Sequence, residues 1–180
     1  VDVATVFARL GRSSNANLAF ESATSVTTSG RYTVNLTGAT SGSAVGSAFT
    51  ETNNQFRFDG NRNLTMTLDV DGAGPQTITF NTDFRNADFG TEVESFRSAL
   101  QTAINTSFPA NQVTVTASGT TNISYTIASN STGTGSSVSI SSAVRAGGES
   151  ALGFDTASVT AGVNASATID GAAATVDGSA

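Results

Sequence analysis

The stretch LTMTLDVDGAGPQTITF, residues 64–80, predicts a β-hairpin. Leu64, Met66, Leu68 and Val70 alternate with polar residues, so one face of the first strand is apolar and the other is polar. The connection DGAGP at 71–75 supplies glycines that tolerate the positive φ angles of a tight turn. We therefore expect two antiparallel strands, at 64–70 and 76–80, with one face buried.

One helix follows this hairpin, at residues 91–105. Thr91 is the predicted N-cap, and Glu94 stands three residues later, as in a capping box. Apolar side chains recur at helical spacing along one side of this segment: Val93, Phe96, Leu100 and Ile104.

Four further strands are predicted around the hairpin and helix, at 55–59, 113–117, 123–128 and 137–141. Eight of the 11 Phe residues lie between positions 49 and 108, which predicts a separate aromatic core. They are Phe49, Phe56, Phe58, Phe80, Phe84, Phe89, Phe96 and Phe108.

The flanking segments predict a second unit made from both ends of the chain. Residues 1–16 read as the end of a flanking helix, 17–36 as two strands, 38–54 as a linker or long loop, and 167–178 as a hairpin with a turn at Asp170-Gly171. The expected fold is mainly β with one helix (α+β), in two small antiparallel β-rich domains. An inner domain would comprise 17–48 plus 156–180, and a Phe-rich β/α domain at 49–155 would be inserted into it.

Composition argues against most enzymes and against a nucleic-acid partner. The 180 residues include 66 Ser, Thr and Asn, while all eight basic residues are Arg, and Lys, His, Cys and Trp are absent. The usual general base, thiol nucleophile and commonest metal ligands are therefore missing. The net charge of −6 disfavours phosphate binding, and no apolar run is long enough to span a membrane. We expect no catalytic residue, no metal and no cofactor.

Two acidic motifs have competing interpretations. Asp69, Asp71 and Gly72 resemble half of a calcium loop, but the acidic residue expected at the twelfth position is missing, which favours a hairpin turn. Glu92 and Glu94 could form the carboxylate pair of a glycosidase. Because they stand two residues apart on a helix, their side chains point in different directions. This favours a role in stabilising the start of the helix.

The segment 10–40 contains GRYTVNLT at 30–37. It resembles the GxYxVxxT pattern of the flagellar filament cap family, also called hook-associated protein type 2. The strand, helix, strand order of 64–140 resembles a module found in outer domains of cap proteins and flagellins. The segment VTAGVNASATIDGAAATVDG at 159–178 resembles the flagellin hook IN motif, with IDG in place of the commoner ING.

This resemblance implies a structural protein without enzymatic activity, the head region of a filament cap. Such a chain would form a ring-shaped homo-oligomer, assist flagellin assembly at the filament tip, and reside outside the cell after export by the flagellar type III pathway. Host surface glycans are a further expected partner. Two alternatives stay open: the variable outer domains of flagellin, and a glycan-binding adhesin or phage tail-fibre module.

Three arginines in the Phe-rich segment are the residues we expect at subunit contacts, namely Arg57, Arg62 and Arg85. Arginine is enriched at protein interfaces because its planar group forms several directed hydrogen bonds. The competing interpretation for each of them is ordinary solvated surface.

Overall fold

The computed structural model describes residues 30–50 and 55–175. The predicted flanking helix at 1–16 and the first predicted strand after it lie outside the described residues. The elements follow in the order β1 (Val34–Thr37), β2 (Ser43–Val45), β3 (Phe49–Thr50), β4 (Leu64–Val70), β5 (Gln76–Phe80), α2 (Phe89–Ser107), β6 (Val113–Ser118), β7 (Asn122–Ser129), β8 (Val138–Arg145), η1 (Phe154–Thr156), β9 (Ser158–Thr160), β10 (Ser166–Ile169) and β11 (Ala172–Ala174).

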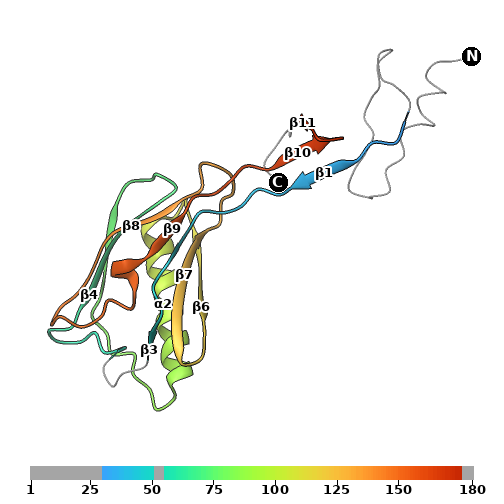
Figure 1. Cartoon of the computed structure of the whole chain (residues 1–180). Helices are drawn as coiled ribbons and strands as arrows, with labels where there is room; N and C mark the ends of the chain where they lie inside the picture. The colour runs from blue at the N-terminus through green and yellow to red at the C-terminus, as the bar shows by residue number, and fades with distance from the viewer. Residues whose placement is uncertain (1–29, 51–54, 176–180) are drawn as a thin grey trace, which may run out of the picture.

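The strands form three antiparallel sheets, which confirms the mainly β class. The described part of the chain has one α-helix, α2, and η1 is a single short 3₁₀ turn. One sheet has the order β5-β4-β8, a second has the order β3-β7-β2-β9 with β6 also paired to β7, and the third has the order β1-β10-β11. Figure 1 shows α2 running along the main body between β4 and the β6-β7 pair, while β1, β10 and β11 project away from it.

The predicted hairpin at 64–80 is confirmed with both strands at their expected bounds. Burial alternates along β4, and its four apolar side chains are fully buried. Asp71 and Gly72 occupy the turn with φ of 54° and 70°. On the outer face, hydroxyl groups of Thr67 and Thr77 lie 2.9 Å apart across the two strands. The alternation of apolar and polar residues in the sequence therefore predicts both strands and which face of β4 is buried.

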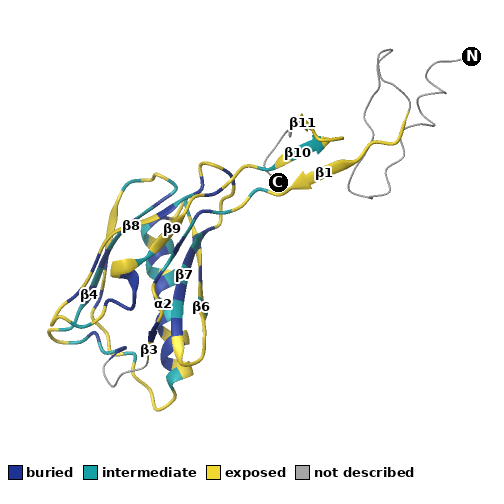
Figure 2. Ribbon diagram, in the orientation of Figure 1, coloured by how far each residue is buried: buried dark blue, intermediate teal, exposed yellow. Residues whose placement is uncertain are grey.

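Aromatic rings join α2 to the sheets on either side of it. The Phe96 ring is fully buried, and its centroid lies 5.1 to 5.9 Å from five other rings, those of Phe56, Phe58, Phe80, Phe84 and Tyr125. Tyr125 on β7 stacks between Phe49 and Phe154 and donates a hydrogen bond of 3.0 Å to the Val93 carbonyl. Figure 2 shows the buried residues concentrated on α2, β4 and β7.

The helix begins earlier than predicted, at Phe89, so the assignment of Thr91 as its N-cap is wrong. Asp88 caps the helix by accepting a hydrogen bond of 3.0 Å from the Gly90 amide, and it also accepts one from the Thr91 hydroxyl. Glu92 accepts a hydrogen bond from the Asn86 amide at 2.6 Å. An Asp and a Thr three residues apart are both good caps, and the preceding loop decides between them.

The prediction of a linker or long loop at 38–54 is wrong for residues 43–50, which contain β2 and β3. Ala44 on β2 is fully buried between β7 and β9. A side chain at Gly42 would collide with the backbone carbonyl of Ser136, so the chain approaches its neighbour closely only because the residue there is glycine. The small residues Gly42 and Ala44 therefore allow this part of the chain to pack closely against its neighbours.

The strand predicted at 55–59 is also wrong. Only a single bridge forms there, between Arg57 and Asp83, although the flanking Phe56 and Phe58 are fully buried. The alternating pattern arises because both rings point into the aromatic core from an irregular segment, without a neighbouring strand to pair with.

Two strands from the segments predicted as the inner domain, β2 and β9, lie in the same sheet as β7 of the Phe-rich segment. The division into 17–48 plus 156–180 and 49–155 stays a prediction. The hairpin predicted at 167–178 is confirmed up to residue 175 as β10 and β11, with the turn at Asp170 and Gly171, and residues 176–178 lie outside the described residues.

We predict that Phe96→Ala destabilises the protein by about 3–5 kcal/mol, because it removes a ring packed against five others and leaves a cavity. Val144→Ala is the matched control, since Val144 is 59% exposed and its loss should change stability by no more than about 0.5 kcal/mol. Urea unfolding measures both variants. A loss below about 1 kcal/mol for Phe96→Ala would contradict this account of the core.

Candidate interaction surface

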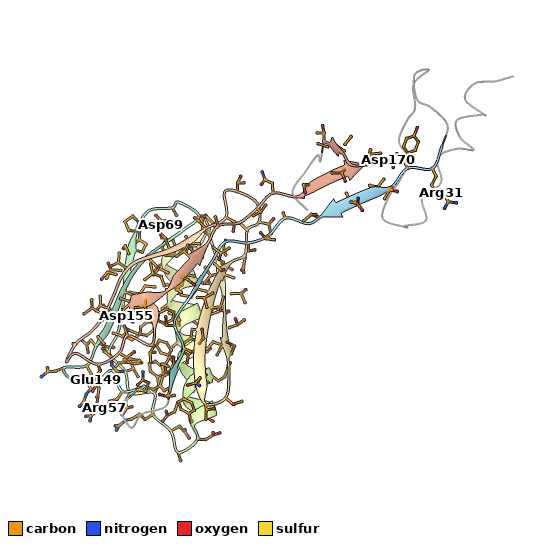
Figure 3. The ribbon with its side chains drawn as sticks, in the orientation of Figure 1. Arg31, Arg57, Asp69, Glu149, Asp155 and Asp170 are labelled. Atoms are coloured by element: carbon orange, nitrogen blue, oxygen red, sulfur yellow. The ribbon has the colours of Figure 1, made fainter. Side chains whose placement is uncertain are left out.

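The three arginines expected at subunit contacts lie in loops, and each forms an ion pair with a carboxylate. With Arg145 these residues make up what we call the arginine cluster: Arg57, Arg62, Arg85, Arg145, Asp59, Asp83 and Glu149. The loops before β4 and after β5 are held together by the bridge between Arg57 and Asp83. Figure 3 shows Arg57 and Glu149 at the end of the molecule opposite Arg31 and Asp170.

Each expected contact residue is bound to a carboxylate. Arg57 Nε donates to Asp59 Oδ1 at 2.6 Å, and Arg62 Nε donates to Glu149 Oε1 at 2.9 Å. The side chains of Arg57, Arg62 and Arg85 are 36%, 33% and 40% exposed, so each guanidinium is held in place and still faces solvent. Ordered, half-exposed arginines can meet a polar partner at less entropic cost than mobile ones.

Arg145 at the end of β8 organises this end of the molecule, and sequence reasoning missed it. Its side chain is fully buried, donates hydrogen bonds of 2.7 Å to the carbonyls of Gln55 and Arg57, and lies 4.8 Å from the centre of the Phe58 ring. It also pairs with Glu149 at 2.9 Å. An arginine that ends a strand with an alternating pattern gives no sequence signal of burial. Arg145 thus fixes the irregular segment that carries Arg57.

The Asp83 and Arg85 pair is the best aligned of the cluster. Arg85 Nε lies 2.9 Å and 3.1 Å from the two Asp83 oxygens, and Nη2 lies 2.6 Å from Oδ2. These hydrogen bonds lower the pKa of Asp83 to about 2, with a smaller contribution from the charge of Arg57. The carboxylate therefore stays ionised through all physiological conditions.

Four of the eight arginines of the chain gather in this cluster with three carboxylates, in a protein whose net charge is −6. The arrangement is suited to polar contacts with a neighbouring protein surface, because it presents partly exposed groups of both charges. Whether Arg57, Arg62 and Arg85 contact a partner stays a prediction.

The two acidic motifs have structural roles. Asp71 accepts hydrogen bonds of 2.8 Å from the Ser137 amide and from the Ser129 and Ser131 hydroxyls. Burial opposes ionisation of Asp71, but these hydrogen bonds outweigh it and lower its pKa. The hairpin reading is thereby confirmed, and Asp71 joins the hairpin to the loops around β7.

The glutamates near the start of α2 have separate partners. Glu94 pairs with Arg97, whereas Glu92 accepts a hydrogen bond from the Asn86 backbone. Within residues 30–50 and 55–175, no three acidic, His or Cys side chains gather as metal ligands would. The hollow on the outer side of α2 is shallow and open, and it is lined by Glu94, Ser95, Ser98, Ala99, Thr102 and Ala103.

None of the helices in the described part of the chain has the length and apolar character needed to cross a membrane.

No family model and no curated protein sequence matches this chain. It is similar to the solved D2-D3 domains of the flagellar cap protein FliD from Escherichia coli, with 20% identity, a TM-score of 0.46, and coverage of 79% of this chain and 71% of that one. The E. coli D1-D2-D3 structure is 17% identical with a TM-score of 0.46, and the match covers 81% of this chain and 41% of that one. The D2-D3 domains from Serratia marcescens are 18% identical with a TM-score of 0.44, and the match covers 79% of this chain and 75% of that one.

We predict that Asp83→Asn destabilises the protein at neutral pH by about 1 kcal/mol. The loss is small because solvent screens this partly exposed ion pair. Because the folded pKa of Asp83 lies below the ordinary value of 3.8, the ionised pair stabilises the folded state above pH 3.8. That contribution is lost as the pH falls through about 2, so the two proteins should converge there.

Urea unfolding at several pH values measures this difference. Asp155→Asn, at an exposed carboxylate of η1, is the control and should change stability by less than about 0.5 kcal/mol at every pH. A deficit of Asp83→Asn that is the same at pH 2 and pH 7 would contradict the assigned role of the ion pair.

Proposed function

We propose that this chain is the head region of a bacterial flagellar filament cap, a structural protein that supports flagellin assembly at the filament tip. The observation that carries the proposal is the pairing of β1 with β10. Val34 lies in the GxYxVxxT-like stretch at 30–37 and Ile169 lies in the hook-like stretch at 159–178, yet the two residues are direct partners in one sheet. Two family-like stretches far apart in sequence thus belong to one structural unit.

The composition supports the same role. A subunit exported unfolded through a narrow channel benefits from having no disulfides, and this chain has no Cys. Short hairpins such as β4-β5 and β6-β7 pair residues close in sequence, which favours rapid refolding after export. We therefore propose an extracellular location on the flagellum, reached through the flagellar type III pathway.

The proposed partners are further copies of the chain in a ring, and flagellin. The arginine cluster is the surface we assign to contacts between copies, because its side chains are ordered, half exposed and of both signs. We propose host surface glycans as an additional partner.

Two other functions have specific support. The strand, helix, strand module of 64–140 and the hook-like stretch are equally compatible with the variable outer region of flagellin. From a different class, a β-rich surface of Thr, Ser and Asn suits a glycan-binding adhesin or phage tail-fibre module. Heptad-patterned helices in sequence on both sides would favour either flagellar role, whereas tandem copies of the β module would favour an adhesin.

We predict that deleting the gene leaves cells non-motile and releases flagellin into the medium as unpolymerised subunits, because filament growth lacks its cap. Motility assays and sedimentation of flagellin from culture medium measure this result, and the intact gene should restore filaments. Normal filaments in the deletion strain would refute the cap proposal. Loss of surface binding with unchanged motility would favour the adhesin instead.

We also predict that replacing Arg57, Arg62 and Arg85 together with Gln weakens ring formation by the full-length protein at least about tenfold in concentration. The matched control is Arg31→Gln, at the opposite end of the molecule (Figure 3). Mass photometry gives the ring fraction, and circular dichroism checks folding. An unchanged ring fraction in the folded triple variant would assign these arginines to solvated surface.

A further inference from the structure

Strand β6 lies at the edge of its sheet, because it pairs with β7 and with no other strand of the described chain. An open edge presents unpaired N–H and C=O groups to which a strand of another molecule can bind. The β6 sequence, VTVTAS, favours such pairing, because it is rich in β-branched residues and contains neither a charged residue nor proline. Left open, this edge would favour association between molecules.

Helix α2 runs beside β6 (Figure 1), and its side chains bind the backbone of the edge. Asn105 accepts a hydrogen bond of 2.7 Å from the Val113 amide and donates one of 3.2 Å to the Val113 carbonyl. Gln101 accepts one of 2.9 Å from the Val115 amide, and Arg97 Nη1 donates one of 3.1 Å to the Val115 carbonyl. Both polar backbone groups of Val113 and of Val115 thus have partners on α2.

The three side chains stand four residues apart along α2, and we call them the capping stripe: Arg97, Gln101 and Asn105. Residues four apart on a helix are separated by about 6.0 Å along its axis. Alternate residues of a strand, whose N–H and C=O groups point to the same edge, are about 6.6 Å apart. Because the two spacings nearly match, the capping stripe meets alternate residues of β6 as a neighbouring strand would.

We propose that the capping stripe acts as a substitute strand, which closes the β6 edge and prevents a second copy of the chain from pairing with it. The excluded partner is another β6, because two such strands carry no charges that would repel one another. Contacts between copies are thereby left to side-chain surfaces. This inference does not depend on the proposed function, since it follows from the hydrogen bonds between α2 and β6 alone.

Hydrogen exchange of the unmodified chain gives the first test. The amides of Val113 and Val115 should exchange at least about tenfold more slowly than the amide of Ala117, although all three belong to an edge strand. Ala117 is the next residue whose backbone faces this edge, and Arg97, which the spacing places level with it, has donors only. Equal exchange rates at Val115 and Ala117 would overturn the proposal.

The second test opens the edge with Gln101→Ala and Asn105→Ala, since alanine preserves the helix. Sedimentation velocity should show that this variant associates with itself at least about tenfold more tightly than the unmodified chain. Ser98→Ala with Thr102→Ala, on the exposed side of the same helix, is the matched control and should leave association unchanged. A stripe variant that is folded by circular dichroism and associates no more than the unmodified chain would overturn the proposal, because the stripe would then only hold α2 against the sheet.

A pyrene label on a single cysteine locates the contact, in a chain that has no cysteine of its own. In the stripe variant, labelled Thr116→Cys on β6 should give excimer fluorescence as copies associate, whereas labelled Val144→Cys on β8 should not. Adding Thr116→Lys to the unlabelled stripe variant should restore the association of the unmodified chain, because lysine on an edge strand blocks strand addition. Excimer fluorescence from Val144→Cys alone, or association that survives Thr116→Lys, would overturn the proposal.

A single substitution replaces the stripe variant if that variant fails to fold. Gln101→Ala frees only the Val115 amide and should still increase association, whereas Gln101→Glu keeps an acceptor for this amide and should not. Equal association of the two folded single variants would count against the proposal in the same way.

Discussion

The packing of the Phe96 ring is the interaction on which the described structure depends. A helix with one apolar side needs a surface to bury it, and here aromatic rings from β5, from β7 and from the loops beside β4 and β5 supply that surface. Tyr125 completes the core by stacking between two rings and by hydrogen bonding to the helix backbone. Because the same rings fix the loops before β4 and after β5, the core also positions the arginine cluster.

The two ends of the molecule differ in chemistry. One end carries ion pairs on irregular loops, which Arg145 holds in place through a hydrogen bond to the Arg57 carbonyl and an ion pair with Glu149. The other end is a small sheet that joins the two ends of the described chain. The body between them has polar Thr and Ser on the outer face of β4 and β5. This arrangement places the arginine cluster at a distance from the sheet that joins the two ends of the described chain.

Sequence patterns predicted the elements that bury large alternating side chains. The β4-β5 hairpin and the buried side of α2 follow directly from positions such as Met66 and Leu100, because burial there repeats with the period of the element. Patterns failed where burial depends on neighbours distant in sequence. Ala44 is central to a sheet only because β7 and β9 approach it closely, and Arg145 is buried only because two backbone carbonyls face it. The loops bring the three predicted contact arginines together, and their contact with a partner stays a prediction.

The most direct test of the central claim, that this chain is the head of a filament cap, is the position of the full-length protein on intact flagella. Immunogold electron microscopy with antibodies against this chain should label the distal tip of each filament and leave its length unlabelled. Continuous labelling along the filament would assign the chain to flagellin. Labelling of the cell surface away from filaments would assign it to an adhesin and contradict the account.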